Sequence, residues 1–213
     1  SVAIVSGNDE NVDLNVSTAQ GKTVNGSINV TNVTAGSALN KIVINKALQA
    51  SGAITLVNNE SDINVNANAI VSAANITLQA NGNAINFNGG SLNTTATNGE
   101  LEANGKNINI AGSGIGAVTV DMTATNDISV SGGSVSANDV TLTASGDITQ
   151  SGGSISATDV TLTASGDIAQ SGGSISANDA VLMATQNISQ AAGSIVAVNT
   201  TAEAGTTLSL AST

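Results

Sequence analysis

The sequence lacks the residue types that most folds and most active sites use. Its 213 residues include no Cys, Pro, Trp, Tyr or His and a single Phe, and its four cationic residues are all lysines. The absence of cysteine excludes a disulfide framework, and the absence of proline suits strands that use every backbone N–H. Because an ordinary two-layer domain of this size would contain large aromatic side chains, we expect instead a narrow core of Val, Ile, Leu and Ala.

The charge balance and the missing side chains also narrow the function. The formal net charge is −11 at pH 7, whereas nucleic acids and anionic membrane surfaces require basic patches. No apolar run approaches the roughly 20 residues of a membrane span. Catalysis is disfavoured because histidine, cysteine, tyrosine and arginine supply most catalytic acids, bases and nucleophiles. We therefore predict a protein that is not an enzyme, carries no cofactor, binds no nucleic acid and inserts into no membrane.

One 20-residue unit is written three times in the second half of the chain. The copies begin at Asp127, Asp147 and Asp167, and a fourth, degraded copy begins at Asn187. Self-similarity at a fixed period of this length is typical of a solenoid, in which each unit forms one turn.

Within each unit, short stretches alternate apolar and polar residues, as in Ser154-Ile155-Ser156. A period of two predicts strands and not helices. Ser-Gly-Gly, Asn/Thr-Asp and Ser-Gly-Asp separate these stretches, and all three accept tight turns. The sequence therefore predicts an all-β fold, a parallel β-helix with triangular coils of about 20 residues around a dry aliphatic lumen.

The regularity of the pattern varies along the chain. The pattern predicts an irregular, β-rich start of the solenoid in residues 1–40 and coils with insertions in residues 41–106. It predicts regular 20-residue repeats in residues 107–213. Neither end shows a convincing capping unit, which fits either a piece of a longer solenoid or chains that stack end to end.

Segments 147–157 and 160–167 resemble the repeats of filamentous-haemagglutinin-type exoproteins, the large secreted adhesins of the two-partner secretion pathway in Gram-negative bacteria. The resemblance covers 107–213 well and 41–106 more loosely. It implies a single-stranded right-handed parallel β-helix, export across the outer membrane to the cell surface or the extracellular space, and a rigid surface fibre. The export motif of that family's secretion domain is not found here, which implies an interior or distal piece of the shaft.

Two functions follow as hypotheses. The first is a non-catalytic shaft segment of a large secreted surface adhesin, whose partner is a host or neighbouring cell surface. The second is a subunit of a self-assembling extracellular filament or surface layer, whose partners are other copies of the chain. A monomeric rod in dilute solution favours the first, and fibres of uniform width favour the second.

Stacked aspartates are the first candidate site. Asp127, Asp147 and Asp167 should form one corner column, and a second column of metal candidates contains Asp139, Asp159 and Asp179. Carboxylates suit Ca²⁺, but the calcium-binding nonapeptide pattern is absent. A structural corner, in which Asp accepts a turn N–H, is the favoured interpretation.

A segment that departs from the regular repeat, either residues 1–40 or an inserted loop, is the second candidate site, because near-identical coils lack the aromatic and arginine anchors of most interfaces. An insertion of two residues is expected in 93–99, after Leu92. The candidate binding residues are Asn93, Thr94, Thr95, Thr97, Asn98, Glu100 and Glu102. Phe87, on the preceding strand, is either part of this surface or a core residue that fills a wider coil.

Overall fold

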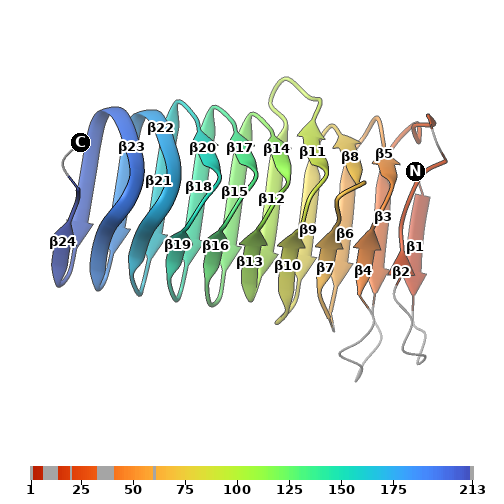
Figure 1. Cartoon of the computed structure of the whole chain (residues 1–213). Helices are drawn as coiled ribbons and strands as arrows, with labels where there is room; N and C mark the ends of the chain where they lie inside the picture. Colours follow the sequence, from red (N-terminus) through yellow and green to blue (C-terminus); the bar gives the residue numbers. More distant parts are fainter. Residues whose placement is uncertain (1, 7–13, 20, 33–40, 60, 212–213) are drawn as a thin grey trace.

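The protein is a stack of β-strand turns. The structure is a computed structural model that describes residues 2–6, 14–19, 21–32, 41–59 and 61–211. In this part of the chain about 65% of residues are in strands and none is in a helix. All 24 strands belong to one parallel sheet that winds through about eight turns (Figure 1). The predicted all-β parallel solenoid is therefore confirmed.

Each turn contributes one strand to each of three faces. The first face contains β2 (Leu14–Asn15), β4 (Ile42–Ile44), β7 (Ile63–Val65), β10 (Ala84–Phe87), β13 (Asn107–Ile110), β16 (Ile128–Val130), β19 (Ile148–Gln150) and β24 (Thr207–Ser209). The second face contains β5 (Ala47–Gln49), β8 (Ile70–Ala73), β11 (Ser91–Thr94), β14 (Gly114–Gly116), β17 (Ser134–Ser136) and β20 (Ser154–Ser156). The third face contains β1 (Val2–Ser6), β3 (Ile28–Asn32), β6 (Ile54–Asn58), β9 (Ile76–Ala80), β12 (Glu100–Gly105), β15 (Thr119–Ala124), β18 (Asp139–Ala144) and β21 (Asp159–Ala164). The two long strands β22 (Ile168–Ala184) and β23 (Asn187–Ala204) run through all three faces.

The core consists of columns of identical or similar side chains. In the first face the isoleucines that pair from turn to turn are at most 3% exposed; they are Ile42, Ile63, Ile85, Ile108, Ile128, Ile148, Ile168 and Ile188. Burial of one such side chain contributes about 1.5–3 kcal/mol. Because the same residue recurs at the same place, a shift in register by one residue would turn a whole column outward.

The expectation of a purely aliphatic, dry lumen is wrong in part. Phe87 is fully buried, so the question of its place is settled in favour of the core. Three glutamines, Gln150, Gln170 and Gln190, are also buried and follow Val130 in one inward column of the first face. They are accommodated because Gln170 Nε2 donates to Gln150 Oε1 over 3.0 Å. Polar groups that bond one another across turns can replace aliphatic side chains inside a solenoid.

Asparagine ladders support the outer surface of the earlier turns. Asn86 Nδ2 donates to Asn64 Oδ1 over 2.8 Å, and Asn109 Nδ2 donates to Asn86 Oδ1 over 2.7 Å. A second ladder passes through Asn66, which donates to Asn45 and accepts from Asn88. Each amide thus serves as donor to one turn and acceptor for the next, which fixes the vertical alignment of side chains.

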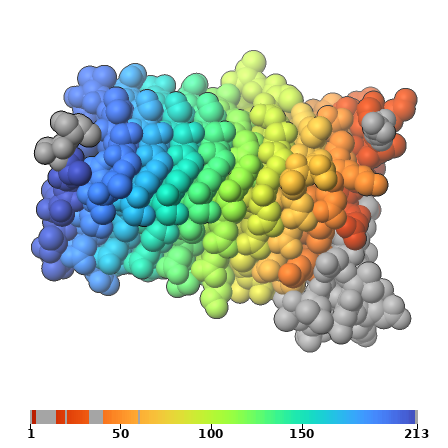
Figure 2. All heavy atoms as spheres, in the orientation of Figure 1, coloured from red at the N-terminus to blue at the C-terminus, as the bar shows by residue number. Residues whose placement is uncertain are grey.

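The turns differ in length where the sequence is irregular. Ile28 pairs with Ile54 and Leu14 with Ile42, so the described parts of residues 1–40 belong to the same sheet, whereas 33–40 lie outside the described residues. From Ile108 onward the first-face isoleucines are spaced by 20 residues. In Figure 1 the connection between β11 and β12 stands out from the stack, and Figure 2 shows it as a bulge on an otherwise even surface.

Candidate functional site

Among the connections that the structure describes, the protruding one between β11 and β12 departs most from the regular turn. Nine positions separate Leu92 from Leu101, against five between their partners Ile115 and Val120 in the next turn. Four residues are therefore inserted at this corner. The sequence correctly located the insertion within 93–99, but the prediction of two inserted residues is wrong, because one residue fewer elsewhere in the turn hides part of the extra length. The structure places the extra length at 95–98, beyond the last paired residue of β11.

Backbone hydrogen bonds hold both ends of this loop. Thr95 N–H donates to Ala73 O over 2.8 Å, and Gly99 O accepts from Val118 N–H over 2.9 Å. Within the loop, Gly99 N–H donates to Ala96 O over 3.0 Å. The loop is thus attached to the turn before it and to the turn after it, and its projecting residues rest on a fixed base.

The predicted loop residues have different surroundings. Asn93, Thr95, Thr97 and Asn98 are exposed, whereas Thr94 is half-buried and its Oγ1 has no hydrogen-bond partner among the described residues. A Cβ atom on Gly116 would lie only 2.7 Å from Oδ1 of Asn93, so the Asn93 side chain covers this glycine of the next turn. The exposed hydroxyls and amides can donate and accept hydrogen bonds to a polar ligand.

The remaining two predicted residues, Glu100 and Glu102, lie in β12 and begin an acidic stripe along the third face. The register aligns Glu100, Thr119, Asp139, Asp159, Asp179 and Asn199 in one outward column. Beside it, Glu102 pairs with Asp121. We call Glu100, Glu102, Asp121, Asp139, Asp159 and Asp179 the acidic stripe. The structure thus brings together the loop-side glutamates and the aspartate column, which the sequence had treated as separate sites.

Sequence reasoning missed Asp121, although the signal was present. In the repeat frame Asp121 occupies the place of Thr141 and Thr161, so alignment of residues 107–126 with the later units would have placed it outward beside Glu102. Partial burial, followed by the Glu102 carboxylate, raises the pKa of Asp121 above its ordinary value. Asn104 Nδ2 donates to Glu102 Oε1 over 2.7 Å and orients that carboxylate.

Asp159 is the central carboxyl of the stripe. Loss of surrounding water raises its pKa first, and the neighbouring Asp179 and Asp139 raise it further, through like charge and through hydrogen bonds between the carboxyl groups. Asn199 Nδ2 donates to Asp179 Oδ1 over 2.6 Å at the end of the column. The protonated form of Asp159 is therefore favoured more than that of an isolated aspartate, because neighbouring carboxylates at one strand spacing repel one another.

The other aspartate column has a structural role. Oδ1 of Asp127 accepts the backbone N–H of Asp147, and Oδ1 of Asp167 accepts the backbone N–H of Asn187. These carboxylates satisfy turn amides, as the sequence predicted. In the described part of the chain no group of three or more His, Cys, Asp or Glu side chains is arranged to hold a metal ion.

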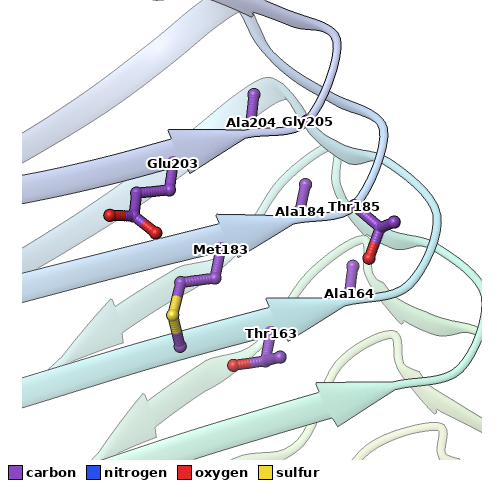
Figure 3. Close-up of a pocket in the computed structure, with 8 residues that line it drawn as sticks. All are labelled: Thr163, Ala164, Met183, Ala184, Thr185, Glu203, Ala204 and Gly205. Atoms are coloured by element: carbon purple, nitrogen blue, oxygen red, sulfur yellow. The ribbon is translucent and has the colours of Figure 1, made fainter.

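A shallow groove lies at the edge of the third face, in the last turns. It has a volume of about 320 Å³. Figure 3 shows Thr163, Met183 and Glu203 projecting side by side from three successive strands, with Thr185 on the adjoining corner. Glu203 is the single titratable residue of its lining, so the groove offers a shallow surface for contact without a paired acid and base.

No helix of the described residues is long and apolar enough to span a bilayer.

Comparison with known proteins gives no relative from which a role could be transferred. No protein-family model matches the chain, and no curated protein and no solved structure is found to be similar to it.

Proposed function

We propose that the chain is a non-catalytic segment of the fibre of a large secreted bacterial surface adhesin, of the filamentous-haemagglutinin type that its repeats resemble. In this proposal the protein is exported by two-partner secretion from a Gram-negative bacterium and acts at the cell surface. The observation that carries the proposal is the repeated turn-to-turn register of the three faces from Ile108 to Ile188, in which the register shifts only at the corner between Gln170 and Ser174. Such a regular stack suits a uniform spacer.

The outward surface of the regular turns supports a spacer role. On the second face the outward residues are small and polar; they are Gly114, Gly116, Ser134, Ser136, Ser154, Ser156, Ser174 and Ser176. Such a surface lacks the large aromatic and arginine side chains that provide most binding energy in protein interfaces. The regular turns therefore serve to hold other parts of the fibre at a distance.

Recognition of a host or neighbouring cell surface belongs in this proposal to the loop 95–98 and the glutamates beside it. The loop projects from the stack and carries exposed Thr95, Thr97 and Asn98. Its ends are fixed by backbone hydrogen bonds, which lowers the entropy lost when a ligand binds.

The location is tested by immunogold labelling of intact and permeabilised cells of the source bacterium with antibodies raised against this chain. The proposal expects label on intact cells and an open reading frame that also encodes secretion and tip domains. Label confined to permeabilised cells would contradict it.

The binding role is tested with beads coated with the chain and applied to cultured host cells. A variant lacking residues 95–98 restores the five-residue spacing of the regular corner and should fold unchanged. A matched control replaces 95–98 by Ser-Gly-Ser-Gly and keeps the length. Both variants should lose adhesion of the beads while their circular dichroism spectra stay the same; full adhesion of either variant would exclude the loop as the site.

A self-assembling extracellular filament is the second candidate, and one observation favours it. Large apolar side chains are exposed on β23 and β24, including Val196 at 63%, Val198 at 79% and Leu208 at 50%. Exposed apolar groups beside open strand edges promote association between copies. Sedimentation velocity separates the two candidates, because a shaft segment stays monomeric on concentration whereas a filament subunit polymerises.

A further inference from the structure

Five Asn-Gly dipeptides occur in the less regular half of the chain, and only one of them, at Asn98, belongs to the proposed binding loop. Their asparagines are Asn25, Asn81, Asn88, Asn98 and Asn104. In an Asn-Gly pair the glycine nitrogen can attack the side-chain amide carbon of the asparagine, because glycine has no Cβ to obstruct the approach. The local structure decides whether that attack occurs.

Hydrogen bonds occupy the attacking nitrogen in two of the pairs. Gly26 N–H donates to Ser51 Oγ over 2.9 Å, after Asn25. Gly99 N–H donates to Ala96 O over 3.0 Å, after Asn98. Each bond must break before the nitrogen can react, which slows the reaction about fivefold relative to a free N–H.

Packing obstructs two further pairs. Gly89 is buried, and a Cβ atom on it would lie 2.7 Å from Cα of Ala67, so there is no room for a ring beside Asn88. Gly105 is buried within β12, where it pairs with Ala124, so ring closure at Asn104 would require the strand to leave the sheet.

The pair Asn81-Gly82 is free of all these restraints. Both residues are exposed in the turn after β9, and nothing lies within 4 Å of where a Cβ of Gly82 would be. No hydrogen bond of Gly82 N–H is found among the described residues, since the turn is closed instead by Asn83 N–H donating to Ala80 O. A groove of about 190 Å³ beside the pair gives water access to it.

The side chains next to Asn81 also favour the reaction. Gln79 Nε2 donates to Asn81 Oδ1 over 2.8 Å, which draws electron density from the amide carbon that would be attacked. Asn81 Nδ2 in turn donates to Asn59 Oδ1, so the amide group is held in one orientation. This oriented and polarised amide lies one residue before a free glycine N–H.

We propose that Asn81 is a site of spontaneous deamidation, the one among the five Asn-Gly pairs, all of which lie in the described residues, that the folded structure leaves open. Gly82 N loses its proton to solvent and forms a bond to Cγ of Asn81; the Cγ–Nδ2 bond breaks, and Nδ2 leaves as ammonia after taking a proton from solvent. One water molecule then opens the cyclic imide at either carbonyl and gives aspartate or isoaspartate. The sequence of steps consumes water, releases ammonia and changes no oxidation state.

The test compares the folded chain with the chain unfolded in urea, both incubated in weakly alkaline buffer, by peptide mapping and mass spectrometry of all five pairs. In urea the five asparagines should convert at similar rates. In the folded chain Asn81 should convert at least as fast as in urea, because the contact with Gln79 exists only there, whereas Asn25 and Asn98 should slow about fivefold or more. Equal protection of Asn81 and Asn98 in the folded chain would overturn the proposal.

A variant tests the contribution of the neighbouring amide. Gln79→Ala should slow conversion of Asn81 in the folded chain about fivefold and leave its rate in urea unchanged. Thr77→Ala, on the same strand and face, is the control and should change neither rate. If Gln79→Ala converts at the rate of the unaltered chain, polarisation by Gln79 is excluded.

Discussion

The backbone N–H of Asp167 donates a hydrogen bond to Oδ1 of Asp147, its equivalent one turn earlier, over 2.8 Å. Asp147→Ala removes this acceptor and should lower the free energy of unfolding by about 1 kcal/mol. Asp147→Asn keeps Oδ1 and should change it little, since Asn107 serves Asp127 in the same way. Urea unfolding followed by circular dichroism measures both, and equal losses in the two variants would contradict this role of the carboxyl oxygen.

Ile155 tests the stacked core. It is 1% exposed between Val135 and Ile175, so Ile155→Asp buries an unpaired carboxylate and should cost several kcal/mol of unfolding free energy. Ser156→Asp, one residue further and outward, is the matched control and should stay within about 0.5 kcal/mol. A similar drop in the thermal unfolding midpoint for both variants would show that the inward and outward assignments are wrong.

The glutamine column makes a prediction about combined substitutions. Gln170→Val leaves Gln150 Oε1 and Ser194 O without the donor they have now, and should cost about 1–3 kcal/mol. Substitution of Gln150, Gln170 and Gln190 together by Val extends the column begun by Val130 and leaves no unpaired Gln150 Oε1. Because Ser174 O and Ser194 O still lose their side-chain donors, the triple variant should recover only part of that loss. A triple variant whose unfolding midpoint lies below that of the single variant would refute this account.

The acidic stripe predicts that stability rises as the pH falls. The pKa of Asp159 is higher in the folded state than in the unfolded chain. At pH values between these two pKa values, the folded state therefore binds more protons than the unfolded chain. The free energy of unfolding therefore increases as the pH falls through the folded pKa, and this gain is lost again as the pH rises. Asp121 acts in the same direction, beside Glu102.

Asp159→Asn isolates this effect. At neutral pH the variant should unfold at a higher temperature than the unaltered chain, because one of three adjacent charges beside Asp139 and Asp179 is removed. The difference should shrink on acidification. A constant difference between the two thermal midpoints from neutral to acid pH would argue against a raised pKa at Asp159.

The regular turns could be predicted from sequence because local pattern and long-range pairing agree. Ile128, Ile148 and Ile168 recur at the repeat distance, and their alternation with polar residues gives their direction. Gln150 was missed because it shares the inward direction of Ile148, two residues away, but has the wrong polarity. Two hydrogen bonds across the turn explain how the Gln150 amide is buried: its Oε1 accepts from Gln170 Nε2, and its Nε2 donates to Ser174 O.

The candidate site was less predictable for a similar reason. The inserted loop was visible as a break in the repeat. The residues at which it begins and ends depend on strand pairing, and Thr94 belongs to the strand β11. The meeting of Glu102 with Asp121 depends on a register across a turn of irregular length. Because irregular turns cannot be aligned with the 20-residue unit, the sequence does not show which of their side chains point outward.

The equivalence of the turns that begin at Asp127, Asp147 and Asp167 has a genetic consequence. Removal or duplication of one 20-residue unit would leave every remaining column in register, because each turn presents the same surface above and below. Recombination between the near-identical coding repeats can therefore change the length of the protein in whole turns, about 4.8 Å at a time, without a folding penalty. Alleles of this gene should differ from one another by complete units in this region.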